Sequence, residues 1–443
     1  MNPTRIVAWQ LVRGGTGAPT LAVDAAAREH EFDARDRGLV RRLVDLEARR
    51  RGTLRVILAR LASRKPSADL AAHLHLGLVQ AFFLDRIPDH ALVNETVGAV
   101  RQTLGDGPAR FANAVLRAAL ALRQEGTRGD PRRDLPLRPW HLAEPLFHDP
   151  VEHPLLWAEE ALSMPASVFK HWHKRFGNER AKELAVQALD EPKLSLRVVR
   201  GDASELLAEL TALGVHAAVG THPRIVLVDY ADAELALNSA AIGEGRATVQ
   251  GESALRAAEA VGAREGEHVL DLCASPGGKT AVLAETGARV VACDVSPEKL
   301  ERLASTLARL GLSERVDTLD VRDPTVLAGR TFDAVLVDAP CSNTGVLARR
   351  PEARWRFGPA TKASLLELQA RLAELALPLV RPGGRLVWST CSLDSDENAR
   401  RAKQIVDAHP DFTLAAEHEA LPASVGAAGP VDGGYFARLV RRA

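Results

Sequence analysis

The sequence has few cysteines, and none of them forms the close pairs that bind zinc or build a disulfide framework. Only four occur in 443 residues, namely Cys273, Cys293, Cys341 and Cys391. All four lie in the second half of the chain, each beside the end of a predicted strand, and none belongs to a C-x-x-C pair. This pattern argues against a disulfide-rich secreted protein and against a zinc site. We therefore expect no metal and a reducing compartment, the cytoplasm.

A net charge and long apolar runs are also absent. Lys and Arg together number 57, as do Asp and Glu, so binding to a polyanion must depend on local patches. The first five residues lack the apolar core of a signal peptide. No run of about 18 apolar residues indicates a membrane span, and we expect no membrane association.

Length and composition predict a multidomain globular protein, because 443 residues with 46% hydrophobic content suffice for two or three cores. Residues 4–125 show helical periodicity throughout, which predicts an all-α bundle over residues 1–126. Residues 127–145 are rich in Arg, Asp and Pro and are predicted to form an exposed linker. Residues 146–240 predict a small α+β module, and residues 241–443 an α/β domain.

Two basic segments are candidates for RNA contact. Residues 35–64 contain ten arginines and three acidic residues, a local excess of seven positive charges. Such a density can neutralise several phosphates, and we predict that Arg49–Arg51 contact RNA. The alternative is a solvated helix face, the more common role of a charge run. In the second segment, residues 349–356, Trp355 either stacks on a base or packs in the core.

Residues 268–284 predict a strand, a turn of small residues and a helix. The turn has the sequence Cys273-Ala274-Ser275-Pro276-Gly277-Gly278-Lys279. A Walker phosphate loop needs a glycine at position 273, and the dinucleotide fingerprint needs non-adjacent glycines, so neither motif is present. The glycines still allow close approach of a nucleoside-bearing ligand. Asp294, at the end of the next predicted strand, is placed to accept hydrogen bonds from a ribose.

Apolar strands alternate with helices in the last 200 residues, which predicts a parallel, doubly wound sheet. The strands are expected at residues 269–272, 290–293, 316–319, 334–337 and 385–389. Ligands of such sheets bind at the carboxyl ends of the strands. The candidate functional residues follow strands in this way: Cys273, Asp294, Asp320, Asp338 and Cys391.

Three segments, residues 271–280, 337–345 and 389–392, together resemble the signature motifs of S-adenosylmethionine-dependent RNA cytosine-5 methyltransferases. Within these, the likeness is to the Sun/Fmu group that acts on small-subunit (16S) ribosomal RNA. Residues 111–117 resemble the antitermination factor NusB and the matching N-terminal domain of that group. The resemblance implies a NusB-like RNA-binding domain, a Rossmann-like class I methyltransferase domain, S-adenosylmethionine as cofactor, and ribosomal RNA or an assembling small subunit as partner. We expect a monomer.

The resemblance also implies residue roles. Cys391 would be the catalytic nucleophile, Cys341 would promote product release, and Asp338 would contact both the cytosine edge and the cofactor. The loop of residues 273–279 would line the cofactor. Asp294 would bind the ribose hydroxyls, and Asp320 would lie near the adenine.

The chemistry explains why two cysteines are needed. C5 of cytosine is a poor nucleophile, so a thiolate first adds to C6 and makes C5 able to attack a methyl sulfonium. A hydrogen bond or proton at N3 assists the addition, and a base must later remove the C5 proton so that the thiolate can leave.

Other interpretations remain open at this point. One is a transfer RNA cytosine-5 methyltransferase of the same superfamily, and another is a non-catalytic RNA-binding ribosome-assembly factor. A DNA cytosine-5 methyltransferase is disfavoured, because those enzymes lack the second Thr-Cys-Ser motif. The chain departs from the family pattern at Val199, where the family has Asn, and at Gly251, where it has Asp.

Overall fold

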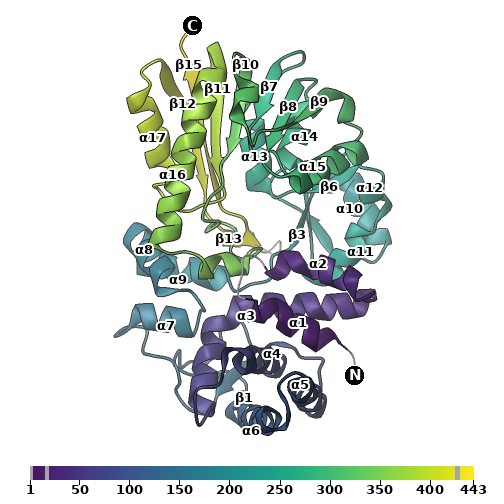
Figure 1. Cartoon of the computed structure of the whole chain (residues 1–443), viewed down its shortest axis with the longest axis vertical. Helices are drawn as coiled ribbons and strands as arrows, with labels where there is room; N and C mark the ends of the chain where they lie inside the picture. Colours follow the sequence, from purple (N-terminus) through teal and green to yellow (C-terminus); the bar gives the residue numbers. More distant parts are fainter. Residues whose placement is uncertain (1–2, 15–18, 425–429) are drawn as a thin grey trace. The chain divides into compact units, whose positions relative to one another are not determined.

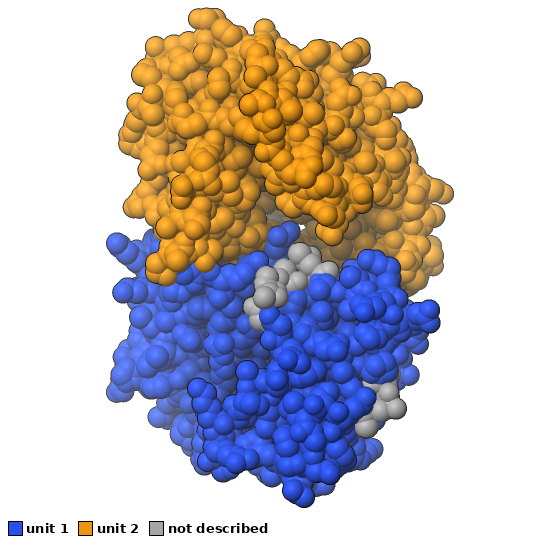
Figure 2. All heavy atoms as spheres, in the orientation of Figure 1, with its two compact units in different colours: residues 1–190, 350–358 blue, residues 191–349, 359–443 orange. Residues whose placement is uncertain are grey.

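The computed structural model describes residues 3–14, 19–424 and 430–443, and its chain forms two compact units (Figures 1 and 2). The first contains residues 1–190 and 350–358, and the second contains residues 191–349 and 359–443. A short segment from the second half of the chain therefore belongs to the first unit. The domain boundaries expected from the sequence remain predictions. Within the described residues, no helix is long and apolar enough to cross a membrane.

The first unit is helical apart from one short hairpin. Its elements are α1 (Thr4–Arg13), α2 (Pro19–Glu29), α3 (Ala34–Leu61), α4 (Ala68–Phe83), α5 (Asp89–Leu104), α6 (Asp106–Leu122), β1 (Arg123–Glu125), β2 (Trp140–Leu142), α7 (Pro154–Glu160), α8 (Ala166–Phe176), α9 (Asn178–Gln187) and the 3-10 turn η4 (Pro351–Trp355). Side-chain caps begin two of the helices, since Asp33 accepts from the Asp36 N–H and Ser67 from the Leu70 N–H.

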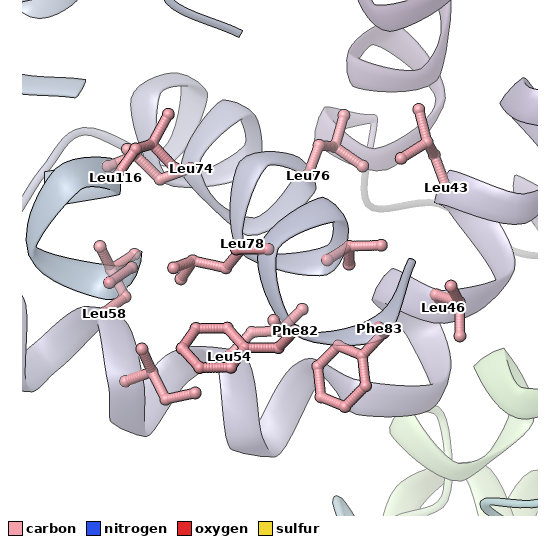
Figure 3. Packing of buried hydrophobic residues seen from close by; sticks show 14 of the residues in the cluster. Leu43, Leu46, Leu54, Leu58, Leu74, Leu76, Leu78, Phe82, Phe83 and Leu116 are labelled. Carbon is pink, nitrogen blue, oxygen red and sulfur yellow. The ribbon is translucent and has the colours of Figure 1, made fainter. Parts of the chain in front are cut away.

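Helix α4 lies in the core of the first unit and is buried on nearly every side. Leu74, Leu78 and Phe82 are at most 1% exposed and belong to the same cluster as Leu43 and Leu54 of α3 (Figure 3). A helix that is apolar all round is stable only inside a core. Each such side chain contributes about 1.5–3 kcal/mol on burial, so this helix organises the bundle.

Residues 127–145, for which the sequence predicts a linker, lie within the first unit. Strand β2 pairs antiparallel with β1, with Arg123 opposite Leu142. Leu135 and Leu142 are buried in the core around α4. The stretch is rich in helix breakers because it folds as turns around a two-stranded hairpin.

Two arginines that we predicted as RNA contacts are buried in this unit. Arg49 is 1% exposed and donates to the carbonyl oxygens of Ala188 (3.2 Å) and Asp190 (2.7 Å). Arg50 is 4% exposed and donates to the carbonyl oxygen of Pro136 at 3.0 Å. The prediction is therefore wrong for both residues. Their guanidinium groups satisfy backbone carbonyls that distant segments bring to α3.

The second unit begins with a small antiparallel sheet of order β4-β5-β3-β6. Its elements are β3 (Leu194–Val198), α10 (Ala203–Ala212), β4 (Ala217–Val219), β5 (Ile225–Val228), η1 (Tyr230–Asp232), α11 (Ala233–Leu237), α12 (Ala240–Gly243) and β6 (Ala247–Val249). Arg197 of β3 is fully buried and pairs with Glu285 at 2.7 Å. This ion pair attaches the small sheet to the helix that carries Glu285.

A seven-stranded sheet of order β12-β15-β11-β10-β7-β8-β9 forms the rest of this unit. Its elements are α13 (Glu252–Glu259), β7 (His268–Asp271), α14 (Gly278–Glu285), β8 (Arg289–Asp294), α15 (Pro297–Leu310), η2 (Ser313–Arg315), β9 (Val316–Asp320), η3 (Pro324–Leu327), β10 (Phe332–Asp338), α16 (Pro359–Ala376), η5 (Leu377–Leu379), β11 (Val380–Thr390), α17 (Ala399–Ala408), β12 (Phe412–Ala420), the hairpin β13 (Ala423–Ser424) and β14 (Pro430–Val431), and β15 (Gly434–Arg441).

The predicted fold class is confirmed, with one addition. Strands β7 to β11 pair in parallel, as expected, whereas β12 and β15 are antiparallel strands that we did not predict. The chain runs outward from β7 through β8 to β9 and then returns to β10, on the other side of β7. This reversal creates a crevice at the carboxyl ends of β7 and β10, where doubly wound folds bind ligands.

Alternate residues of the central strands enter two different cores. Val335 and Val337 of β10 pack with residues of α16 and α17, whereas Ala334 and Leu336 pack with residues of α14 and α15. Helices therefore cover both faces of the sheet, because side chains of a strand alternate in direction. The carboxyl ends of the strands are left for the site.

Candidate functional site

The loop of residues 273–279 joins β7 to α14 and is held by bonds to the next strand and helix. The Ala274 N–H donates to the carbonyl oxygen of Cys293 at 2.9 Å. Ser275 Oγ donates to the carbonyl oxygen of Lys299 at 3.1 Å. The loop predicted to line the cofactor is therefore anchored on β8 and on α15.

Gly277 and Gly278 give this loop its close packing. Gly277 has a φ of 101°, and a Cβ there would come within 2.7 Å of Leu303 Cδ1. A side chain would therefore be both strained and crowded at this position. At Gly278, the ideal Cβ position lies 3.5 Å from the amide of Gln250. Pro276 precedes the pair and completes the small-residue turn.

Cys273 and Cys293 are thiols without a sign of activation. Burial raises the pKa of Cys293 to about 12 and raises that of Cys273 well above its ordinary value. A reactive cysteine needs a lowered pKa. Neither thiol is therefore a candidate nucleophile; Cys293 packs inside β8, and the contact of Cys273 with the cofactor stays a prediction.

Asp294 and Asp320 end neighbouring strands and are register partners. Asp294 is 5% exposed, and its Oδ1 accepts from the Val295 N–H at 2.8 Å. Asp320 is partly exposed and is bound by Arg322 at 2.6 Å, and these hydrogen bonds lower its pKa. Two carboxylates on adjacent strand ends provide acceptors for ligand hydroxyl and amino groups.

Asp271, the last residue of β7, is a candidate that we did not predict. It is 1% exposed, and its Oδ2 accepts from Thr280 Oγ1 at 2.8 Å. Within the described residues, its Oδ1 is buried and has no hydrogen-bond partner. Burial raises the pKa of Asp271 to about 7, and the negative charges of Asp338 and Asp294 act in the same direction. In the sequence, Asp271 stands near the end of the first predicted strand, residues 269–272, and this place could have marked it as a candidate.

Lys279 and Asp338 form an ion pair across the crevice. Lys279 Nζ lies 2.7 Å from Asp338 Oδ2. Burial alone would lower the pKa of Lys279, but Asp338, with smaller contributions from Cys391 and Asp271, raises it above its ordinary value. The loop after β7 and the end of β10 are thereby linked, as the crevice geometry requires.

Cys341 and Cys391 are brought together by the ends of β10 and β11. Asp338 and Ser389 are register partners on these strands, and the two cysteines follow shortly after them. Their Sγ atoms lie 3.2 Å apart. The contact with Cys391 and the burial of Cys341 raise the pKa of the Cys341 thiol well above its ordinary value.

Asn343 and Gly345 hold the two cysteine loops together, and neither was assigned a role from the sequence. Asn343 Nδ2 donates to the Cys341 carbonyl at 2.8 Å, and Cys391 Sγ donates to Asn343 Oδ1 at 3.3 Å. The Gly345 N–H donates to the Cys391 carbonyl at 2.9 Å. A Cβ at Gly345 would lie 2.9 Å from that carbonyl oxygen and from Gly433. The two loops can therefore approach this closely only with glycine here.

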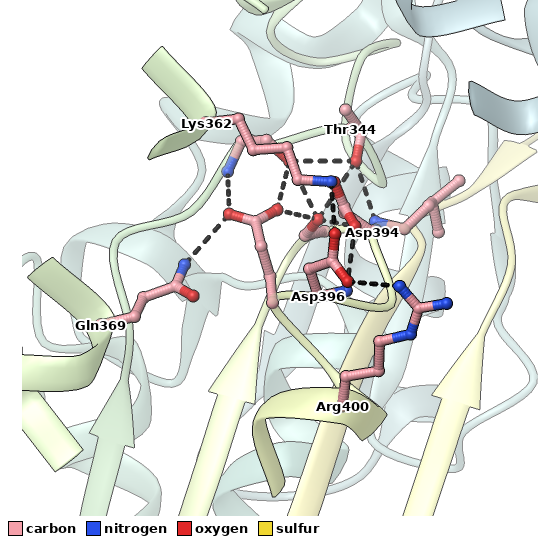
Figure 4. A network of polar contacts seen from close by, with 10 residues as sticks. Thr344, Lys362, Gln369, Asp394, Asp396 and Arg400 are labelled. Atoms are coloured by element: carbon pink, nitrogen blue, oxygen red, sulfur yellow. Dashed lines mark hydrogen bonds and ion pairs between the residues drawn. The ribbon is translucent and has the colours of Figure 1, made fainter. Parts of the chain in front are cut away.

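A buried carboxylate, Glu397, accepts hydrogen bonds from both of the loops that carry Cys341 and Cys391. It is 1% exposed and accepts from the Ser342 N–H at 3.0 Å, from Ser342 Oγ at 2.5 Å and from Ser392 Oγ. Gln369 Nε2 of α16 also donates to it, at 3.0 Å. Figure 4 shows Gln369 and Thr344 in this network. Helix α17 (Ala399–Ala408) begins just after this residue, and the Glu397 side chain itself holds the loops that carry Cys341 and Cys391.

Residues around the crevice fit S-adenosylmethionine, the cofactor expected from the sequence. This molecule carries a sulfonium, an ammonium and ribose hydroxyls, which need anionic or acceptor groups. Asp271, Asp294 and Asp338 supply carboxylates, and the unpartnered Asp271 Oδ1 needs a donor. The buried Nε2 of Gln250 beside Gly278 likewise has no partner in the described chain. Among the described residues, no group of three or more His, Cys, Asp or Glu could hold a metal ion.

Two family models match separate parts of the chain. The model described as 16S rRNA methyltransferase RsmB/F matches residues 258–429, and the model of the NusB family matches residues 14–121. The first match contains the crevice residues from Asp271 to Glu397, and the second contains helices α3 to α5.

Curated relatives are similar over most of their length. The probable ribosomal RNA small subunit methyltransferase B of Bacillus subtilis is 31% identical, with 88% of this chain and 85% of the relative covered. The ribosomal RNA small subunit methyltransferase B of Pseudomonas putida is 32% identical, with 100% of this chain and 99% of the relative covered.

Two solved structures share the fold. The crystal structure of PH0851 has a TM-score of 0.76 at 22% identity and covers 99% of this chain and 98% of its own. The structure of NSun6 from Pyrococcus horikoshii with SFG has a TM-score of 0.53 at 19% identity, covering 62% of this chain and 98% of its own. At these identities the likeness concerns the fold alone.

Proposed function

Because the chain belongs to the 16S rRNA methyltransferase RsmB/F family, we propose that it methylates C5 of a cytosine in small-subunit ribosomal RNA through a covalent Cys391 adduct. The methyltransferase class, the ribosomal RNA substrate class and the cofactor S-adenosylmethionine are those of the family. The cytosine C5 chemistry is our inference from the site.

The observation that carries this proposal is the pair of sulfur atoms 3.2 Å apart at adjacent strand ends. Two thiols so close share one negative charge, because a second thiolate would repel the first. The pKa of Cys341 is raised by the contact with Cys391 and by burial, so Cys341 keeps its proton. Cys391 is partly exposed whereas Cys341 is buried, which supports Cys391 as the nucleophile, the role that the sequence resemblance implies.

The reaction then needs the cytosine ring held in position. The Cys391 thiolate forms a bond to C6 of cytosine, and the π electron pair of the C5–C6 double bond moves onto C5, which becomes the nucleophile for an electrophilic methyl group. The Lys279 ammonium at 2.7 Å stabilises the Asp338 carboxylate, which is suited to accept a hydrogen bond from the 4-amino group of cytosine. S-adenosylmethionine, when bound, supplies an electrophilic methyl group. Asp271, Asp294, Asp320 and the loop of residues 273–279 are proposed to hold it.

Release reverses the addition. Removal of the C5 proton by a base restores the C5–C6 double bond, the Cys391–C6 bond breaks, and its electron pair returns to Cys391 Sγ. The 3.2 Å contact supports a role for the Cys341 thiol in this departure, because it can donate a proton to the leaving sulfur.

The proposal is tested by incubating the full-length protein with S-adenosylmethionine and unmodified 16S rRNA, 23S rRNA or transfer RNA. Nuclease digestion and mass spectrometry then identify the methylated nucleoside. We expect 5-methylcytidine in 16S rRNA alone. 5-Methylcytidine in transfer RNA would overturn the substrate, and a methylated base other than cytosine would overturn the chemistry. No transfer despite normal cofactor binding would favour an assembly factor.

A further inference from the structure

The first unit contains a cavity of about 730 Å³ that has no place in the chemistry described above. Its walls come from α1, α3, α4 and η4, all within this unit. Aliphatic side chains line a large part of it, namely Leu11, Val12, Leu58, Ala59, Ala62 and Ala72. A cavity of this size is in the range of small-ligand sites and can enclose one nucleotide.

Six cations surround the aliphatic lining: Arg13, Arg51, Arg55, Arg64, Lys65 and Arg356. Three of them form ion pairs, since Arg51 pairs with Glu47 at 2.7 Å, Arg13 with Asp69 at 3.1 Å and Arg356 with Glu352 at 4.0 Å. In the part of the chain that the structure describes, no carboxylate forms an ion pair with Arg55, Arg64 or Lys65, which are all exposed. Such unneutralised charges at the mouth of a cavity attract an anion.

Trp355 of η4 lines the cavity and is held in place. Its Nε1 donates to the Ala48 carbonyl at 2.6 Å, and the guanidinium carbons of Arg51 and Arg55 lie 5.4 and 5.1 Å from its ring centre. The ring is half-buried. Indole and guanidinium planes are the groups on which unpaired bases stack.

Glu352, also in η4, adds an unsatisfied acceptor to the lining. The residue is 4% exposed, and within the described chain its Oε2 is buried without a hydrogen-bond partner. Arg356 Nη2 lies 4.0 Å from the other oxygen, Oε1. A buried carboxylate oxygen of this kind needs a donor, and the exocyclic amino group of a nucleobase is a suitable one.

We propose that this cavity binds one unpaired nucleotide of an RNA strand. The base lies against Trp355 and donates its amino group to Glu352, while the neighbouring phosphates contact Arg55, Arg64 and Lys65. This inference rests on the proposed function, because it assumes an RNA substrate. An acidic peptide fits less well, since Glu352 would face its carboxylates. The predicted RNA contact of the arginine run is thereby moved from Arg49 and Arg50 to this cavity.

The test uses the full-length protein and a fluorescent ten-nucleotide single-stranded RNA of mixed sequence. Replacing Arg55 and Lys65 together by Ala should weaken binding roughly tenfold or more. It should also reduce the slope of log affinity against log salt by about 1.4, at about 0.7 for each lost phosphate contact. The matched control replaces Arg101 and Arg110 by Ala, because both are exposed, on α5 and α6, outside the cavity, and it should leave affinity and slope unchanged.

A photocrosslink gives a second measurement that does not depend on variants. A strand containing 6-thioguanosine, a photoreactive base that keeps an exocyclic amino group, should crosslink to peptides that contain Trp355 or residues 55–65. Crosslinks confined to other peptides, or the same affinity and salt slope in the Arg55/Lys65 variant as in the wild type, would overturn the cavity site even if the enzyme methylates RNA normally. Binding of fluorescent polyglutamate that is lost in the Arg55/Lys65 variant, with no measurable binding of the RNA, would assign the cavity to an acidic peptide. If the variant loses binding while no methyl transfer is found, the cavity stands and the proposed function falls.

Discussion

At the scale of single residues, the proposed mechanism makes Cys391 the nucleophile and Cys341 a proton donor during release. Their sulfur atoms are 3.2 Å apart, and this contact together with burial raises the pKa of the Cys341 thiol. This division of roles does not follow from either cysteine alone. It depends on the loops that bring the two thiols into contact.

The first prediction concerns the nucleophile. Cys391→Ser should lower the rate of methyl transfer by several orders of magnitude, because a serine hydroxyl is far less acidic and less nucleophilic than a thiol. Binding of S-adenosylmethionine, measured by calorimetry, should stay within about twofold of the wild type. As a control, Cys293→Ala should retain activity, since that thiol is fully buried in β8. Normal turnover of Cys391→Ser would remove it from the mechanism.

The second prediction concerns the pH dependence of stability. The pKa of Asp271 is about 7 in the folded protein, raised mainly by burial from 3.8. The folded state therefore holds this proton more tightly than the unfolded state. The resulting contribution to the free energy of unfolding is complete below about pH 4 and is lost as the pH rises to about 7. Asp271→Asn should remove this loss, which is at most about 4 kcal/mol. Urea unfolding of the protein without cofactor at pH 5 and pH 8 measures it, and identical pH slopes in variant and wild type would contradict it.

At the scale of elements, the loops after β10 and β11 depend on Glu397. This carboxylate accepts from Ser342, Ser392 and Gln369, so three segments meet at one buried group. Figure 4 also shows Lys362 of α16 with Asp394 and Asp396, at 2.6 and 2.7 Å. These ion pairs attach the loop that follows Cys391 to α16. Both cysteine loops are therefore held by contacts that lie outside the motifs themselves.

The third prediction tests this support. Glu397→Gln replaces a carboxylate oxygen by an NH₂ donor, which would face the donors of Ser342, Ser392 and Gln369. We therefore expect it to lower the free energy of unfolding by about 2–4 kcal/mol. The rate of methyl transfer should fall more than tenfold at a temperature where the variant is folded, while the affinity for S-adenosylmethionine should change little. Glu367→Gln on α16 is the matched control, because that side chain is 74% exposed, and it should change neither quantity. A folded Glu397→Gln enzyme with wild-type kcat would refute the positioning role.

Sequence patterns predicted the central strands but not all elements. β7 and β8 are apolar runs that end in candidate site residues, so their place and type could be predicted. β12 could not, because most of its residues are exposed and it lacks an apolar run. The partners of Glu397, such as Ser342 some 55 residues earlier, are tertiary contacts with no local signal. For the same reason, the charge run around Arg49 could not show that carbonyl oxygens of a distant segment accept hydrogen bonds from the Arg49 guanidinium group.

At the scale of the whole molecule, the chain leaves the methyltransferase unit once and returns to it. Residues 350–358 belong to the first unit, although they follow the Cys341 loop in sequence. Arg354 in this segment is fully buried and donates to the carbonyl of Ala188 at 2.7 Å, whereas Trp355 lines the cavity. The sequence marked the segment as basic and aromatic, but periodicity cannot show that it folds into another unit.

The most direct measurement is a denaturing gel of the full-length Cys341→Ala protein incubated with 16S rRNA and S-adenosylmethionine. Without the Cys341 thiol, departure of Cys391 from the methylated base should be blocked, so a covalent protein–RNA complex should accumulate, with little in the wild type. A protein in which both Cys341 and Cys391 are Ala should form none. Absence of the complex in the single variant would contradict the release role of Cys341, and its persistence in the double variant would contradict Cys391 as the nucleophile.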